Sequence, residues 1–183
     1  LIHEVVQQVI GLTDVHQVAE ISAELLARYF AYELAAVFIA DAQGVLTIGG
    51  FGGTSQNVVR RAMKSFEYPI SGGITGHVFE TGESLVVNDV SQDSRYRSLH
   101  GWQAGSEMCV AIRDGAKVLG IIDVESRSSN AFTHNDFMAL ESLAGILASV
   151  ITSADQYQRF QATIGELRST QNELRDRMEA QRK

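Results

Sequence analysis

The sequence predicts an α+β fold, in which helices flank a central antiparallel sheet of about six strands and a long helix ends the chain. Short apolar runs separated by glycine turns between residues 34 and 126 are typical of strands. Apolar residues at helical spacing fill both ends of the chain. Hydrophobic residues make up 45% of the 183 residues, which is enough for a packed core.

The first 30 residues predict two helices. Apolar side chains recur at helical spacing through residues 1–11. Thr13 and Asp14 can cap a second helix, because short polar side chains accept hydrogen bonds from the first free amides of a helix. The second helix would turn these side chains to the core: Val15, Val18, Ile21, Leu25 and Tyr29.

The middle of the chain alternates strands with turns and short helices. Three apolar runs predict strands: "LAAVFIAD" (34–41), "VLTIGGFGG" (45–53) and "SLVVNDV" (84–90). Residues 56–66 predict a helix. The stretch "SGGITGHVFETG" predicts a glycine loop and a short helix from Ile74 to Thr81, with Gly82 just past its end. A polar loop follows the third strand, up to Gly105.

Two further apolar runs, "EMCVAI" and "VLGIIDVES", predict a hairpin around Asp114-Gly115. The simplest register places Glu107 opposite Asp123 and Cys109 opposite Ile121. Alternation then puts these side chains on one face: Glu107, Cys109, Ile121, Asp123 and Glu125. Acids so close need a compensating amine, water network or cation. The alternative is that they lie at a frayed, solvated end of the hairpin.

Thr133 can cap a last helix that runs from residue 134 to 181, about 70 Å at the usual helical rise. Its apolar residues follow alternating three- and four-residue spacing: Leu143, Ile146, Val150, Tyr157, Phe160, Ile164, Leu167, Leu174 and Met178. Residues 154–183 have no core of their own, so we expect a second copy to cover this stripe in a dimeric coiled coil. Gln171 would form a polar layer there. A solvated single helix is the alternative.

The composition limits the partners. The net charge is −7, and a compact acidic body is a poor binder of nucleic acid or anionic membranes. No run of 18 apolar residues is present, so we expect no membrane contact. The single cysteine excludes an internal disulfide and suits the cytoplasm. Because the chain starts at Leu1 rather than Met, we expect it to be a fragment of a larger protein.

The order of elements resembles a GAF domain over residues 1–153. The resemblance is carried by "GITGHVFETGESLVVNDVSQDSRY" (73–96), "SEMCVAI" (106–112), "GIIDVES" (120–126) and "AFTHNDFMALESLAGILASVI" (131–151). It implies helices on one side of the sheet and a small-molecule pocket on the other. It also implies a sensory role, with residues 154–183 as a linker to an output domain such as a histidine kinase or a diguanylate cyclase.

The resemblance extends to GAF-type free methionine sulfoxide reductases, which bind substrate with acids at positions similar to Glu107, Asp123 and Glu125. Their reaction needs a nucleophilic and a resolving thiol. Those cysteines would fall near Thr75, Asp93 and His100, and none of these residues is a cysteine. We therefore expect no enzyme activity and interpret Cys109 as a wall residue of the pocket.

Tyr96, His100 and Trp102 lie on the loop that closes over the pocket in GAF domains. The predicted ligand contacts are Phe51, Ile74, Thr75, Asp93, Tyr96, His100, Trp102, Glu107, Cys109, Asp123 and Glu125. The cofactor is left unknown. Residues 88–105 hold no cysteine for a bilin, the cyclic-nucleotide signature is incomplete, and a lone His77 or His100 is a weak haem ligand. A lid that fills its own cavity, in a ligand-free dimerisation spacer, is the alternative.

Overall fold

A computed structural model describes residues 2–54, 72–98 and 101–180. The elements are α1 (Ile2–Val9), α2 (Val15–Phe30), β1 (Leu34–Ala40), β2 (Leu46–Gly52), α4 (Gly73–Thr81), β3 (Leu85–Val87), a 3₁₀ turn η1 (Val90–Gln92), β4 (Ser106–Asp114), β5 (Lys117–Ser126) and α5 (His134–Ala180). The predicted order of elements is therefore confirmed. The helix predicted at 56–66 lies outside the described residues.

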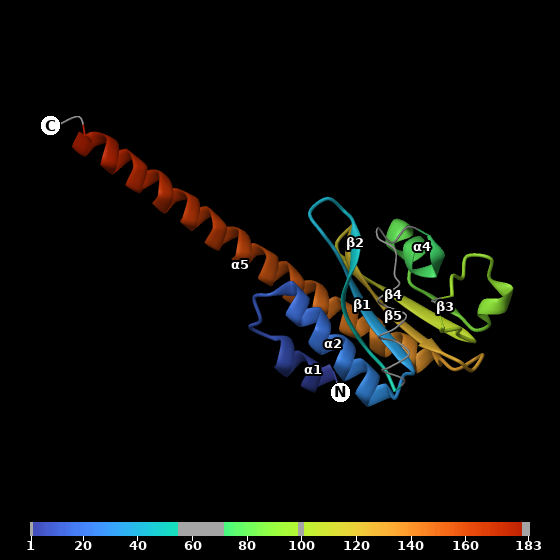
Figure 1. The fold of residues 1–183 in the computed structure, drawn as a ribbon. Coiled ribbons are helices and arrows are strands. Elements are labelled where there is room, and N and C mark those ends of the chain that lie inside the picture. Colours follow the sequence, from blue (N-terminus) through green and yellow to red (C-terminus); the bar gives the residue numbers. More distant parts are fainter. Residues whose placement is uncertain (1, 55–71, 99–100, 181–183) are drawn as a thin grey trace.

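The strands form one antiparallel sheet in the order β2-β1-β5-β4-β3. The described residues hold five strands, close to the predicted six. Helices α1, α2 and α5 cover one face, while α4 and the loop before β4 lie on the other (Figure 1). The sheet therefore separates a helical core from a second, smaller core.

Alternation along the strands assigns side chains to the two cores. On β4 and β5 one set faces the helical core: Met108, Val110, Ile112, Ile122 and Val124. The intervening positions Cys109, Ala111 and Ile121 belong to the second core with Ile74 and Trp102. Both strands of this hairpin, β4 and β5, are thus buried on both faces of the sheet.

The predicted hairpin register is wrong by two residues. Cys109 pairs with Asp123, and Glu107 pairs with Glu125, whereas Ile121 pairs with Ala111. Two one-residue steps cause the shift: Asp114 pairs with Lys117 at the turn, and a β-bulge opposite Ile112 and Arg113 adds Leu119 to β5. A shift of two residues leaves each side chain on its predicted face, so the acids still share one surface.

Helix α2 begins as predicted, because the Asp14 carboxylate accepts hydrogen bonds from the amides of His16 (2.9 Å) and Gln17 (3.5 Å). Val18 and Leu25 are buried against the sheet. The inward orientation predicted for Tyr29 is wrong: its side chain is 41% exposed and lies under the Arg28 guanidinium. In the last turn of α2, Ala27 and Phe30 rather than Tyr29 contact the helical core.

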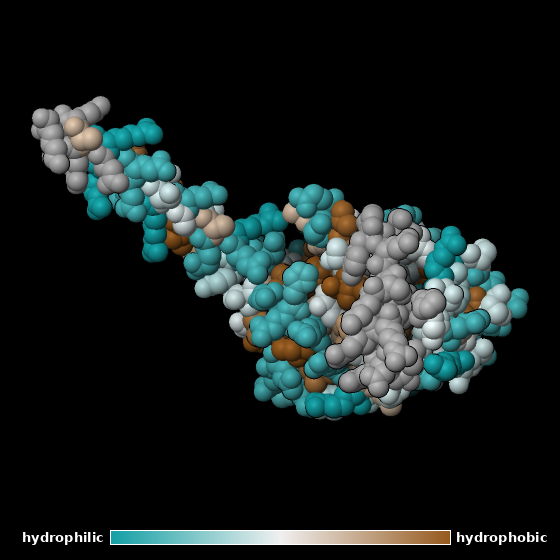
Figure 2. Space-filling view, in the orientation of Figure 1, coloured by the Kyte–Doolittle hydropathy of each residue, from teal (hydrophilic) through white to brown (hydrophobic). Residues whose placement is uncertain are grey.

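Helix α5 starts with a capping box, in which Thr133 and Asp136 exchange backbone-to-side-chain hydrogen bonds. Its first half is buried against the sheet as far as Ala154. Beyond that residue it projects from the domain as a mostly hydrophilic rod (Figure 2). Apolar side chains remain exposed along the rod: Tyr157, Phe160, Leu167, Leu174 and Met178.

Among the described residues, α5 is the one helix long and apolar enough to cross a membrane. Its most apolar window has a mean hydropathy of 1.6, and 39% of that window is buried inside the fold. Core helices of soluble proteins meet the same criterion, so this is weak evidence for a membrane span.

Candidate functional site

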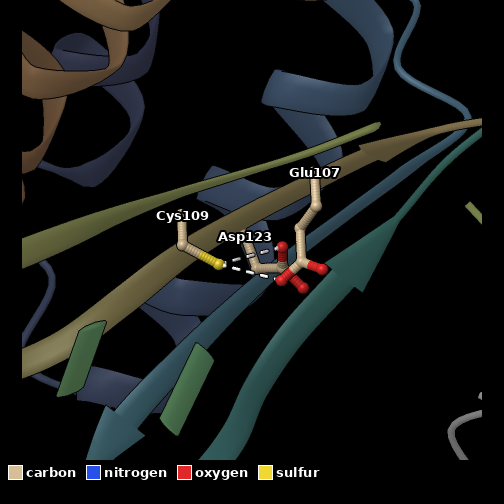
Figure 3. A group of neighbouring side chains, drawn as sticks. All are labelled: Glu107, Cys109 and Asp123. Carbon is tan, nitrogen blue, oxygen red and sulfur yellow. Dashed lines mark hydrogen bonds between the residues drawn. The ribbon is translucent and has the colours of Figure 1, made fainter. Parts of the chain in front are cut away.

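Four buried side chains on β4 and β5 form what we call the acidic cluster: Glu107, Cys109, Asp123 and Glu125. The first three point toward one another (Figure 3). The Cys109 Sγ lies 3.2 Å from Glu107 Oε1 and 3.4 Å from Asp123 Oδ1. The three carboxylic side chains are only 4–5% exposed, so the alternative of a solvated hairpin end is wrong.

Strand pairing places the acidic cluster in the middle of the sheet. Asp123 lies between Ala36 of β1 and Cys109 of β4, and Ala36 in turn pairs with Phe51 of β2. Because opposed residues of neighbouring strands face the same side, Phe51 lies in the row that contains Asp123. Ala36 and Phe51 therefore share the face of the sheet that bears the acidic cluster.

Helix α4 closes one side of the acidic cluster. Ile74 is buried in the same core, and Thr75 Oγ1 lies 3.8 Å from Cys109 Sγ. The helix ends at Gly82, whose φ of 70° is in the left-handed region that glycine adopts without strain. The predicted contacts Ile74 and Thr75 are therefore brought to the site.

The loop before β4 covers the acidic cluster with Trp102. This side chain is 2% exposed, and its indole Nε1–H donates a 2.7 Å hydrogen bond to Glu125 Oε2. The Tyr96 hydroxyl accepts a 2.8 Å hydrogen bond from the Ala104 amide, which anchors the same loop. At Gly105 a Cβ would collide with the Arg127 carbonyl oxygen, so only glycine lets the loop approach β5 here.

Charge in the acidic cluster is poorly compensated. Burial, followed by the charge of Glu125, raises the pKa of Glu107, and burial with the charge of Glu107 raises the pKa of Asp123 well above its usual range. Burial and the neighbouring acids raise the pKa of the Cys109 thiol in the same way. Within the described residues, no ion pair joins these acids to a basic side chain. The cluster is therefore suited to a cation.

Asp93 lies in the loop but has its own partner. Its two carboxylate oxygens accept hydrogen bonds from Arg95 Nε (2.9 Å) and Nη2 (2.7 Å). This pairing lowers the pKa of Asp93 to about 2. Asp93 is therefore committed to Arg95 rather than to a ligand, whereas His100 lies outside the described residues.

Two basic side chains near the site were missed in the sequence. The Arg127 guanidinium lies 4.8 Å from the centre of the Trp102 ring, a cation–π contact over the covering loop. Arg95 pairs with Asp93 as described. No spacing rule links residues of a loop to a distant strand end, so only the Asp93–Arg95 proximity in sequence offered a signal.

The structure also holds a cavity of about 470 Å³ whose lining includes no residue of the acidic cluster. It is lined by α2 and by the chain just after β2, including Glu24, Arg28 and Thr54. The convergent, buried polar groups lie at the acidic cluster, and we place the candidate site there.

The sequence profile of the GAF domain family matches residues 14–151. The chain belongs to the GAF domain family. The match covers the sheet, the acidic cluster and the buried half of α5, so the predicted resemblance is confirmed.

This GAF domain also resembles part of a probable 3',5'-cyclic phosphodiesterase of Caenorhabditis elegans, with 26% identity over 52% of the chain. A dual 3',5'-cyclic-AMP and -GMP phosphodiesterase of Drosophila melanogaster is 29% identical over 50% of the chain.

The matched regions span only 14% and 7% of these two phosphodiesterases. Among solved structures, the GAF domain of a Coxiella burnetii phosphoenolpyruvate-protein phosphotransferase has a TM-score of 0.73 at 18% identity, covering 86% of this chain and 94% of that one. A free methionine-R-sulfoxide reductase of Neisseria meningitidis has a TM-score of 0.72 at 20% identity, covering 85% and 89%. At such identities these likenesses show the GAF fold alone.

Proposed function

We propose that this GAF domain is a cytoplasmic sensory module that binds a small molecule at the acidic cluster and relays its occupancy through α5. One observation carries the proposal: the same two strands bear the acidic cluster on one face and pack against α5 on the other. Cys109 and Asp123 face the site, while their neighbours Met108 and Val124 face the helical core that contains Leu140 and Leu143. A shift of either strand therefore changes both the acidic cluster and the packing of α5.

The ligand we propose carries positive charge. Buried acids destabilise the unliganded state, and a cationic group restores the electrostatic balance that the fold itself leaves incomplete. Trp102 covers the site and would have to move, or admit the ligand beside it. Ligand binding would then favour one arrangement of β4, β5 and α5 over another, which is the differential affinity that any relay requires.

The exposed stripe of α5 supports a second copy as its partner. Apolar side chains recur on one side of the rod beyond Ala154, where no other part of the described chain covers them. A parallel or antiparallel helix pair would bury this stripe, with Gln171 as a polar layer. We propose that α5 then carries the signal to an output domain, such as a histidine kinase or a diguanylate cyclase.

A second role, as a ligand-free dimerisation spacer, is favoured by the direct Trp102–Glu125 hydrogen bond, since the covering loop already fills space over the site. Reductase chemistry is disfavoured by the thiol count. The chain has one cysteine, so no second thiol of the same chain can resolve a covalent intermediate on sulfur.

Thermal-shift screening with amines, amino acids, nucleotides and carboxylates distinguishes the sensor from the spacer. We expect a cationic compound to raise the melting temperature of the wild type and to have no effect on Glu107→Gln/Asp123→Asn. Glu166→Gln, which removes an exposed acid of α5, serves as the control and should respond like the wild type. If neither an organic compound nor a divalent metal ion shifts the wild type, the sensory role should be abandoned in favour of the spacer.

A further inference from the structure

The acidic cluster combines two kinds of metal ligand within a small space. Single ligand atoms from Glu107, Cys109 and Asp123 all lie within 4.8 Å of one another. All three side chains are at least 95% buried, so they are not an ordinary solvated group of surface acids. Their convergence is visible in Figure 3, where both oxygen atoms are directed at the sulfur.

Two carboxyl oxygens compete for one thiol proton in the acidic cluster. Cys109 carries a single thiol proton, yet its sulfur faces two carboxyl oxygens, one from Glu107 and one from Asp123. The thiol donates to at most one of these oxygens at a time, and no basic side chain among the described residues forms an ion pair with the acidic cluster. Glu125 is a third acid, and its Oε2 already accepts a hydrogen bond from Trp102. Without a cation, these acids are accommodated only by holding protons of their own, and a bound cation would replace those protons.

The distances fit a metal better than an organic cation. In a tetrahedral site with metal–sulfur and metal–oxygen bonds of about 2.3 and 2.0 Å, the sulfur and oxygen atoms are about 3.5 Å apart. The observed separations are 3.2 and 3.4 Å. An ammonium group with its carbon body needs more room than three atoms in such contact provide, whereas a bare ion occupies only the space among them.

We propose that Glu107, Cys109 and Asp123 bind a divalent transition metal of the Zn²⁺, Fe²⁺ or Co²⁺ type. A thiolate with carboxylates suits such borderline ions, while Mg²⁺ and Ca²⁺ prefer oxygen alone. Three protein ligands leave at least one coordination position for a small molecule. The inference rests on the proposed sensory function and names the cation at its site. Binding forms a metal–sulfur bond and two metal–oxygen bonds, and it releases the thiol proton and any proton that the two carboxyls hold to solvent.

Cobalt is a direct probe, because Cys109 is the chain's only sulfhydryl. We expect the full chain, first stripped with a chelator, to bind one Co²⁺ with a sulfur-to-cobalt charge-transfer band in the near ultraviolet. Zn²⁺ should displace it and raise the melting temperature. Histidines elsewhere could hold cobalt, but they cannot produce this band. Proton release should appear as a dependence of the Zn²⁺ binding enthalpy on the ionisation enthalpy of the buffer.

Variants separate the site from a folding defect. Cys109→Ser should lose the band, and Glu107→Gln and Asp123→Asn should each weaken Zn²⁺ binding at least about 100-fold. The two amide variants remove the cost of keeping a buried carboxyl protonated, so without metal they should melt at or above the wild-type temperature. Glu166→Gln should bind metal like the wild type. Loss of metal binding without loss of stability would support the site.

Absence of the cobalt band in the wild type would overturn the inference, as would equal Zn²⁺ affinity in the wild type and all three variants. If amines but no metal raise the melting temperature through Glu107 and Asp123, the metal is wrong and the sensory function stands. If the wild type binds metal and the variants lose binding as expected, but metal does not change hydrogen exchange in α5, the metal site stands and the proposed relay is wrong.

Discussion

Glu107 and Asp123 place two acids in the core beside an uncharged thiol. An isosteric amide keeps the shape of each side chain and does not titrate, so folding no longer carries the cost of protonating a buried acid near neutral pH. In the presence of a chelator, we expect Glu107→Gln and Asp123→Asn each to raise the free energy of unfolding by about 1 kcal/mol. Urea denaturation measures this, and Glu166→Gln should stay within about 0.5 kcal/mol of the wild type. A clear loss of stability in both amide variants would show that burying these two acids does not lower the free energy of unfolding.

Trp102 is bound to the acidic cluster by its indole N–H. Trp102→Phe keeps an aromatic ring but leaves Glu125 Oε2 without its 2.7 Å donor, so we expect a loss of about 1–3 kcal/mol in the free energy of unfolding. In Trp102→Phe/Glu125→Leu the acceptor is gone as well, and much of the loss should be recovered. Chemical denaturation of the two single variants and the double variant gives the coupling energy; additive losses would show that the hydrogen bond contributes nothing.

The Asp93–Arg95 pair gives a pH signature of its own. The pairing lowers the folded-state pKa of Asp93 from 3.8 to about 2, so its contribution is complete above about pH 4 and is lost as the pH falls toward 2. Because Arg95 is 39% exposed, we expect this contribution to be only about 1 kcal/mol. The difference in unfolding free energy between the wild type and Arg95→Gln should therefore be constant near neutral pH and shrink on acidification. If this difference in unfolding free energy instead increased on acidification, the stabilising role of the Asp93–Arg95 pair would be contradicted.

At the scale of elements, the hairpin shows what the sequence could and could not predict. The alternation of β4 and β5 predicted which side chains share a face, and this is robust because an error of two residues preserves the face. The pairing of Asp114 with Lys117 at the turn and the extra Leu119 on β5 set the actual partners, and nothing in the alternating pattern marks either one. The acidic cluster was thus predictable as a group, while the Cys109–Asp123 and Glu107–Glu125 pairings were not.

Helix α5 was predicted almost to its last described residue, since its capping box and its long apolar repeat are local features. The contacts of Trp102 could not be predicted in the same way. They depend on how an irregular loop folds back onto the end of β5, and Gly105 was not identified as the residue that allows this approach. Helices and strands could be predicted from local sequence patterns, whereas the position of the covering loop depends on tertiary contacts.

The exposed stripe of α5 allows a direct test of pairing between copies. Leu167 and Leu174 are 64% and 55% exposed, so their replacement by glutamate costs the isolated domain almost nothing. In a coiled coil the same change places charge in the buried seam. We expect Leu167→Glu/Leu174→Glu to shift the mass measured by light scattering from dimer to monomer, with an unchanged melting temperature at low concentration.

Asn172→Glu is the matched control, because residue 172 lies off the predicted seam and is exposed. Removal of residues 155–183 should have the same effect as the double leucine variant. A wild type that is monomeric, or a dimer that survives both changes, would show that α5 does not pair through this stripe.

At the scale of the molecule, the two faces of β4 and β5 connect the acidic cluster to α5. If occupancy is relayed, saturating Zn²⁺ should slow amide hydrogen exchange in residues 140–151 of α5 as well as in the two strands. The Cys109→Ser variant under the same conditions is the control and should show neither effect. Protection confined to the strands would mean that the site is structural and isolated from the helix.

Because α5 is one continuous helix, its exposed half moves as a rigid rod with the half that is packed on the sheet. From residue 155 to Ala180 the helix extends about 39 Å beyond its root, by the usual rise per residue. A tilt of about 5° at the root, which small repacking of Leu143 or Leu147 on β4 could cause, moves the tip by about 3.4 Å, given that length. In the proposed relay, a small motion beside the acidic cluster would be magnified at the tip of α5 into a displacement comparable to a change of helix register.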